Sequence, residues 1–225
     1  MSSADGFSFT HWHFPPATHQ PVLYEVANRC RGTILEFGCG EGSTRLLSAV
    51  SRRRGLKLIT LETDPDWMAR YASLASPLHE FRLVTDWGEV LASDEWDDGR
   101  WGLVFVDQHP SEARVATIHR FRSNAEWIVL HDCDYLPVNG LLGRTVRPLL
   151  GPRDVGERAY DDVFSSWKEF FPLEPWPLPT TGPPTLLASN LHSCNIDVDY
   201  ARYNPSAARR AVHRIAQRIP APLRL

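Results

Sequence analysis

Short runs of apolar residues alternate with segments of helical periodicity between about residue 20 and residue 150 of the chain. This alternation is typical of a parallel sheet whose strands are connected by helices that cover its faces. Several of the intervening segments begin with Ser or Asp, which favour the start of a helix. Strands are predicted at residues 33–37, 56–61, 80–84, 102–106 and 127–130, and helices at residues 43–54, 66–73, 111–122 and about 138–150.

The pattern changes beyond residue 151. Residues 171–184 include six prolines, which cannot continue a helix or a central strand, so this segment is predicted to be a loop. The flanking residues 167–173 and 185–189 are predicted to be two terminal strands, one of them antiparallel. Residues 206–219 place apolar and arginine side chains on different faces, as an amphipathic helix requires.

The predicted fold is a Rossmann-like, doubly wound α/β sheet of seven strands, mostly parallel, with an antiparallel terminal strand and helices on both faces. We interpret the 225 residues as a single domain, because 43% of them are apolar and suffice for a core. Residues 1–30 are expected to form an N-terminal lid and helix, and residues 31–150 the ligand-binding core. Residues 151–225 are expected to form the terminal strands, the proline-rich loop and a basic helix.

The four cysteines form no CxxC pair and are interpreted as reduced thiols. The N-terminal segment lacks the cationic and apolar parts of an export signal, and no apolar run approaches the length of about 18 residues that a membrane span needs. We therefore expect a cytoplasmic protein with no membrane partner. Residues 201–225 hold six arginines and no acid, although the whole chain carries a net charge of −3. This basic helix favours a solvent-exposed or homodimer-forming face over a nucleic-acid contact.

The most informative segment is an apolar strand that enters three glycines and then a helix cap. The glycines are spaced as Gly38-x-Gly40-x-Gly42, whereas a dinucleotide-binding loop reads G-x-G-x-x-G. Glu36 stands two residues before the first glycine, where its charge would oppose a bound phosphate and suit a cationic amino group. The pattern therefore predicts a zwitterionic ligand close to the loop backbone.

The segment Glu36-Phe-Gly38-Cys-Gly40-Glu-Gly42 resembles the first motif of the class I S-adenosylmethionine-dependent methyltransferases. In that family the acid and the loop backbone bind the methionine portion of the cofactor. A second acid at the end of strand two holds the ribose hydroxyls. Glu62 follows the second predicted strand 20 residues after Gly42, the separation at which a βαβ unit brings both to one edge. In the family, an acid after strand three lies near the adenine. The resemblance implies S-adenosylmethionine as cofactor. The cofactor-binding residues that it implies are Glu36, Gly38, Gly40, Gly42, Glu62, Asp86, Trp87 and Asp107.

Ionisable residues also follow the fourth and fifth predicted strands, at Asp107 and at His131-Asp132. The carboxyl ends of neighbouring parallel strands meet at one edge of the sheet, which is where open α/β sheets bind ligands. The arrangement is similar to that of catechol-type and sugar O-methyltransferases, in which an acid after strand four and a His-Asp or Asp-Asp pair after strand five face the methyl donor. This resemblance implies that His131, Asp107 and Asp132 are catalytic.

Two mechanisms are open at this edge. A hydroxyl acceptor must lose its proton, and an imidazole accepts protons near neutral pH, so His131 is a candidate base with the neighbouring acids as orienting groups. Alternatively, a divalent cation such as Mg²⁺, held by Asp107, Asp132 and Asp134, would lower the pKa of the hydroxyl. We favour His131, because metal-using relatives often have an acid at this position.

The expected substrate is a small molecule, such as a sugar or a specialised metabolite, and not a nucleic acid. Its contacts are predicted at Trp12 and His13 of the N-terminal lid, at His109 and at Tyr135. Three other hypotheses remain: a noncatalytic binding protein that keeps the fold, an RNA methyltransferase that uses the basic helix, and a nicotinamide-dependent reductase, which the glycine spacing disfavours.

Overall fold

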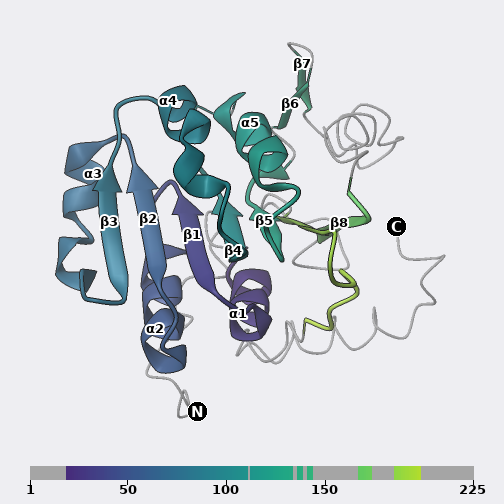
Figure 1. Cartoon of the computed structure of the whole chain (residues 1–225), viewed down its shortest axis with the longest axis horizontal. Helices are drawn as coiled ribbons and strands as arrows, with labels where there is room; N and C mark the ends of the chain where they lie inside the picture. The colour runs from purple at the N-terminus through teal and green to yellow at the C-terminus, as the bar shows by residue number, and fades with distance from the viewer. Residues whose placement is uncertain are drawn as a thin grey trace, which may run out of the picture.

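The computed structural model describes residues 19–110, 112–133, 136–138, 141–143, 167–173 and 185–198. In this part of the chain, a seven-stranded sheet runs in the order β3-β2-β1-β4-β5-β9-β8 (Figure 1). Strands β1 to β5 are parallel, whereas β9 is antiparallel to both β5 and β8. The strands are β1 Thr33–Phe37, β2 Leu58–Glu62, β3 His79–Leu83, β4 Trp101–Val106, β5 Ile128–Leu130, β8 Glu169–Leu173 and β9 Thr185–Ser189.

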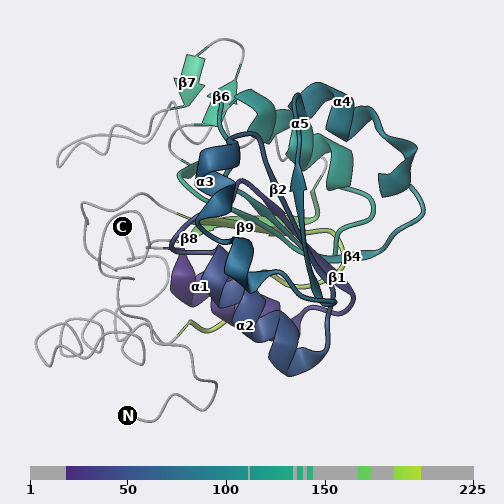
Figure 2. The same cartoon turned by 90° about the vertical axis from the view of Figure 1, so that its left-hand side faces the viewer.

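Helices cover both faces of this sheet (Figure 2). Helices α1 and α2 pack on one face, and α4 and α5 pack on the other, so the predicted doubly wound, mostly parallel α/β architecture is confirmed. The short α3 and a 3₁₀ turn, Ala72–Leu74, connect β2 to β3, and a second 3₁₀ turn, Asp94–Trp96, precedes β4. The helices are α1 Gln20–Arg29, α2 Thr44–Arg54, α3 Pro65–Ala69, α4 Trp87–Ala92 and α5 Glu112–Phe121.

Local sequence explains where several elements begin and end. Helix α2 ends at Gly55, whose φ of 66° is the left-handed conformation that terminates many helices. The single helix predicted for residues 66–73 is divided into α3 and the 3₁₀ turn. Helix α4 was not expected from periodicity, and it begins where the side chain of Asp86 accepts a hydrogen bond from the backbone N–H of Glu89.

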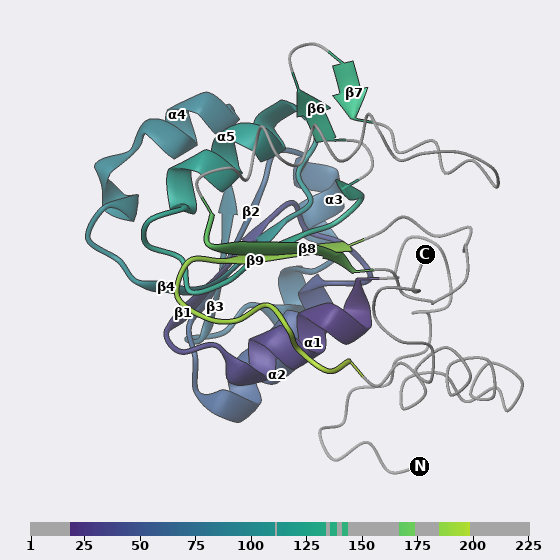
Figure 3. The same cartoon turned by 90° about the vertical axis from the view of Figure 1, so that its right-hand side faces the viewer.

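Two predictions for the C-terminal half need correction. A helix was expected at residues 138–150, but β6 (Leu136–Val138) and β7 (Leu141–Gly143) form a two-stranded antiparallel sheet of their own. The sequence between them is Asn-Gly, the dipeptide that most favours a tight hairpin turn. The loop predicted for residues 171–184 overlaps the terminal strand predicted at residues 167–173, and residues 171–173 belong to strand β8, as that second prediction has it. Proline is tolerated there since β8 is an edge strand, as Figure 3 shows.

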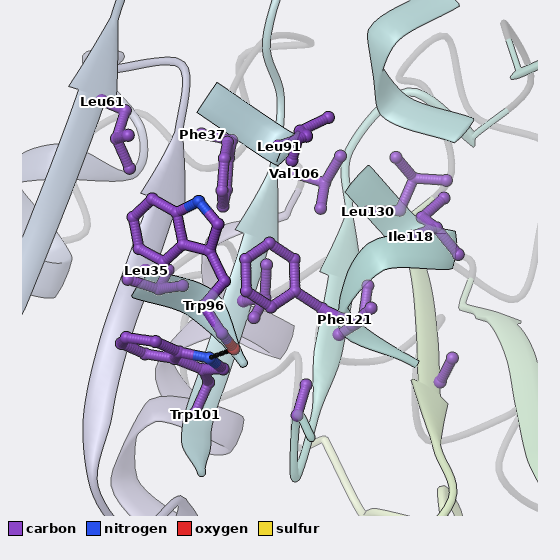
Figure 4. Packing of buried hydrophobic residues seen from close by; sticks show 14 of the residues in the cluster. Leu35, Phe37, Leu61, Leu91, Trp96, Trp101, Val106, Ile118, Phe121 and Leu130 are labelled. Atoms are coloured by element: carbon purple, nitrogen blue, oxygen red, sulfur yellow. Dashed lines mark hydrogen bonds between the residues drawn. The ribbon is translucent and has the colours of Figure 1, made fainter. Parts of the chain in front are cut away.

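The sheet separates two hydrophobic cores. On the α4 and α5 face, the ring of Trp96 lies among Phe37, Trp101 and Phe121, with ring centroids 5.5 to 6.4 Å apart (Figure 4). The indole Nε1 of Trp101 donates to the backbone oxygen of Trp96 at 3.2 Å, which satisfies this buried donor. The other core joins α1 and α2 to the opposite side chains of β1 and β4. These two cores fix the central strands whose ends carry the candidate site.

Some predictions fall outside the described residues. These are the lid residues Trp12 and His13, the residues Asp134 and Tyr135, and the basic helix at residues 206–219. Among the helices that are described, none is long and apolar enough to cross a bilayer.

Candidate functional site

The glycine turn after β1 brings the ends of β1 and β4 into close contact. Gly38 has a φ of 87°, and a Cβ atom there would lie 2.8 Å from the backbone of Asp107. Only glycine fits such a position without strain. The turn then reaches α2, where the backbone N–H of Gly40 donates to the hydroxyl of Thr44 at 2.8 Å. The predicted succession of strand, glycines and helix is confirmed.

Glu36 lies inside the protein, fully buried beneath this turn. Its carboxylate accepts hydrogen bonds from the hydroxyls of Thr44 (3.0 Å) and Thr60 (2.6 Å). Burial raises the pKa of Glu36 to about 7, and these hydroxyl contacts oppose the rise. Glu36 is thus linked to the glycine turn through the hydroxyl of Thr44, which accepts the backbone N–H of Gly40. A direct contact between Glu36 and the amino group of a ligand stays a prediction.

Glu62, the acid that ends β2, lies against the glycine turn, as its spacing predicted. One carboxylate oxygen accepts the backbone N–H of Cys39 at 3.0 Å. The other accepts the N–H groups of Thr63 (2.7 Å) and Asp64 (3.0 Å). These three donors hold an anionic group at the edge of the sheet in one orientation.

An indole that the sequence analysis missed flanks the same turn. The Nε1 of Trp67, in α3, donates to the backbone oxygen of Cys39 at 2.6 Å, and the guanidinium of Arg70 lies 4.2 Å from its ring centroid. Trp67 is partly exposed. Trp67 lies in the first turn of the helix that follows β2, the strand that ends in Glu62, and this position in the sequence is the signal that would have identified it.

The pair Asp86-Trp87 has structural contacts. Asp86 caps α4, and Trp87 is buried against Phe37 with 5.9 Å between the ring centroids. The Nε1 of Trp87 donates to the backbone oxygen of His109 at 2.8 Å, while His109 itself is exposed. The predicted roles of Asp86 and Trp87 near an adenine, and of His109 at a substrate, remain predictions.

The three residues predicted to be catalytic come together at the ends of β4 and β5. Asp107, His131 and Asp132 each offer a ligand atom within 4.8 Å of the other two. The Nε2 of His131 lies 3.1 Å from Oδ1 of Asp132, and His131 is only 3% exposed. Asp132 has a φ of 48°, a left-handed conformation that is unusual for residues other than glycine and that is common at functional sites.

Arg114 of α5 contacts this cluster and was not anticipated from the sequence. Its guanidinium lies 3.1 Å from Oδ1 of Asp107 and also donates to the backbone oxygens of Gln108 (2.9 Å) and His131 (2.8 Å). Burial raises the pKa of Asp107, and Arg114 opposes this rise. Burial likewise raises the pKa of Asp132, and the charge of Arg114 again opposes the rise. An arginine on the buried face of an amphipathic helix was the available signal.

A second imidazole, His19, lies beside His131 at the start of α1. The two ring centroids are 4.2 Å apart in an edge-on arrangement, and His19 is buried. Burial, followed by the proximity of His131, holds the pKa of His19 well below its usual value. The next residue, Gln20, donates from Nε2 to the backbone oxygen of Gly42 at 2.8 Å. The start of α1 therefore contacts both the glycine turn and the strand-end cluster.

Three solved structures resemble this arrangement of elements. The SAH-bound methyltransferase PaMTH1 of Podospora anserina aligns with a TM-score of 0.50 and 15% identity, over 74% of this chain and 75% of its own. The O-methyltransferase TomG of Streptomyces achromogenes, involved in tomaymycin synthesis and solved with SAM, aligns with a TM-score of 0.53 and 20% identity over 77% and 79%. Cofactor-bound Rv0187 from MTB aligns with a TM-score of 0.53 and 20% identity over 79% and 81%.

The chain has the fold of the class I S-adenosylmethionine-dependent methyltransferases. No protein-family model and no curated protein matches the sequence itself. At these identities the likeness establishes the methyltransferase fold. In that fold, the glycine turn, Glu62 and the cluster of Asp107, His131 and Asp132 all lie at the carboxyl edge of the parallel strands, where ligands of open α/β sheets bind.

Proposed function

We propose that the chain is an S-adenosylmethionine-dependent O-methyltransferase that methylates a hydroxyl group of a small molecule, with His131 as the base. The observation that carries this proposal is the placement of two different sets of groups along one sheet edge. The first set, the glycine turn and Glu62, suits a nucleoside amino acid. The second, around His131, suits proton transfer. TomG, with the same fold, is described as an O-methyltransferase, which supports this assignment.

The first set offers hydrogen-bonding groups that S-adenosylmethionine requires. The carboxylate of Glu62 is a fixed acceptor for a ribose hydroxyl, because three backbone N–H groups orient it and its Oε2 accepts only one of them. The backbone of residues 38–42 offers amide and carbonyl groups without side-chain obstruction at its glycines. When bound, S-adenosylmethionine supplies a methyl group on a positively charged sulfur.

The residues of the second set would prepare the acceptor. The Nε2 of His131 lies 3.1 Å from Oδ1 of Asp132. A ring nitrogen of the neutral imidazole would take the proton of the acceptor hydroxyl as the oxygen attacks the methyl group. The carboxylate of Asp132 would stabilise the resulting imidazolium and keep the ring in one orientation.

Asp107, His131 and Asp132 were also the basis for considering a divalent cation. Their ligand atoms are close enough for shared coordination, but Oδ1 of Asp107 is already paired with Arg114, and Oδ1 of Asp132 is close to His131. No step of the proposed reaction depends on such an ion.

Calorimetric titration with S-adenosylhomocysteine tests the proposal. We expect binding to the intact protein, and at least about tenfold weaker binding to Glu62→Gln, because the amide loses a charge-assisted acceptor for the ribose. Glu80→Gln is the matched control, since Glu80 lies on β3 and pairs with Lys57 and Arg82 away from the turn. Absence of binding to the intact protein would refute the proposal.

A further inference from the structure

Arg114 is unusual among the charged groups of α5 because its side chain is only 9% exposed. Burying a guanidinium is costly unless its donors are paired with acceptors. Here all three nitrogens donate: Nη2 to the side chain and backbone oxygen of Asp107, Nη1 to the backbone oxygen of His131, and Nε to that of Gln108. The protein therefore accommodates a full positive charge directly behind the candidate catalytic groups.

These contacts join two strands at the point where their own pairing stops. The register between β4 and β5 ends at Val106 and Leu130, followed by one backbone hydrogen bond from His131 N to Val106 O at 3.1 Å. Beyond that bond, the guanidinium spans the two chain segments. It thereby sets the separation between Asp107 on one strand end and His131 on the other.

The charge balance of the cluster follows from the same contacts. Two carboxylates, Asp107 and Asp132, lie near one guanidinium and the imidazole of His131, while Glu36 and Glu62 add negative potential at Asp107 from the neighbouring strands. A divalent cation bound to Asp107 would lie close to the guanidinium. Their repulsion would weaken cation binding by at least about tenfold, even with substantial solvent screening.

We propose that Arg114 is a positioning residue that takes the place of a divalent cation in this cluster. It holds Asp107 and His131 in register, and its charge keeps divalent metal ions out of the group formed by Asp107, His131 and Asp132. This inference rests on the proposed function for its catalytic meaning, but the ion-binding behaviour that it predicts belongs to the folded protein alone.

Binding of Mn²⁺, measured from the electron paramagnetic resonance signal of the free ion, tests this inference without methyl donor or acceptor. We expect Arg114→Met to bind Mn²⁺ at least about tenfold more tightly than the intact protein, because the repelling charge is removed. Adding Asp132→Asn to that variant should abolish the gain. Arg114→Lys keeps the charge and should behave like the intact protein, which separates the effect of charge from that of altered packing.

Arg120→Met is the matched control. Arg120 lies on the same helix and also binds backbone oxygens and one carboxylate, those of Leu91, Ser93 and Asp97. Its removal should leave Mn²⁺ binding unchanged. The inference is overturned if Arg114→Lys gains Mn²⁺ affinity as Arg114→Met does, or if the intact protein binds Mn²⁺ in a manner that Asp132→Asn removes. The second result can be obtained even if Arg114→Met does not fold.

These outcomes are independent of the calorimetric test with S-adenosylhomocysteine. A protein that binds no S-adenosylhomocysteine but gains Mn²⁺ affinity in Arg114→Met would refute the proposed function and retain the role of Arg114 as a built-in cation.

Discussion

A buried chain of polar groups beneath the glycine turn leads to a specific prediction about stability and pH. His79 on β3 and Thr60 on β2 are 2.9 Å apart between Nε2 and Oγ1, and the Thr60 hydroxyl donates to Glu36 on β1 at 2.6 Å. Because Thr60 donates to Glu36, its oxygen accepts the Nε2–H of His79. The chain thus connects a neutral imidazole to a carboxyl group, and both ends are buried.

Burial disfavours the charged form of both groups, so it raises the pKa of the acid and lowers the pKa of the imidazole. It raises the pKa of Glu36 from 4.5 to about 7, and it lowers the pKa of His79 from 6.5 to about 4. Glu36 therefore contributes stability that is fully present below pH 4.5 and is lost as the pH rises through about 7. His79 contributes stability that is present above pH 6.5 and is lost as the pH falls through about 4.

Each shift is worth about 3 kcal/mol when converted at about 1.36 kcal/mol per pKa unit. Between pH 4.5 and 6.5 the two contributions have opposite slopes and cancel. We therefore expect the free energy of unfolding of Glu36→Gln to rise by about 3 kcal/mol relative to that of the intact protein when the pH is raised from 4.5 to 8. His79→Gln should show the reverse, gaining relative stability as the pH falls from 7 to 4.

Urea unfolding followed by circular dichroism at a series of pH values measures these differences. The double variant, Glu36→Gln with His79→Gln, is the internal control, since it should restore the shallow profile of the intact protein. Profiles for both single variants that run parallel to that of the intact protein would refute the reasoning.

Three further outcomes are expected. His131→Asn should reduce the rate of methyl transfer by about 100-fold or more, because the proton acceptor is lost. Its affinity for S-adenosylhomocysteine, measured by calorimetry, should be unchanged. Unaltered turnover would contradict the role of His131 as base. Gly38→Ala should lower the free energy of unfolding, measured in urea, by about 2 kcal/mol, because its Cβ would meet the backbone of Asp107. Gly55 also has a positive φ but has open surroundings, so Gly55→Ala measures the cost of the backbone conformation without a clash. Trp67→Ala should weaken S-adenosylhomocysteine binding by about tenfold in calorimetry through loss of aromatic contact at the turn; equal affinity would argue that the indole only packs against Cys39.

The sequence predicted those elements and site residues whose placement depends on short stretches of the chain. The bounds of β1 were predicted without error, because its apolar run ends abruptly in glycine. The spacing between Gly42 and Glu62 indicated that the acid would return to the turn, since one helix and one strand span that distance. The same reasoning brought Asp107, His131 and Asp132 to one edge, and the structure has them there.

Residues whose placement depends on tertiary packing were not predictable in this way. Arg114 lies on the buried face of its helix, which signals burial but names no partner, and only the docking of α5 across the strand ends makes it a partner of Asp107. His19 contacts His131 from a part of the chain more than a hundred residues away. Helix α4 and the β6–β7 hairpin are short, and short elements leave too few periods of apolar residues for their type to be recognised.

The position of β9 has a consequence for how the chain folds as it is synthesised. Strand β5, directly before His131, pairs on one side with β4 and on the other with β9. Until residues 185–189 have left the ribosome, β5 presents an open hydrogen-bonding edge to the cell, and such edges recruit other strands. We expect nascent or prematurely terminated chains that lack β9 to associate through this edge, so that the part of the domain nearest to His131 is the last to mature and the first to need a chaperone.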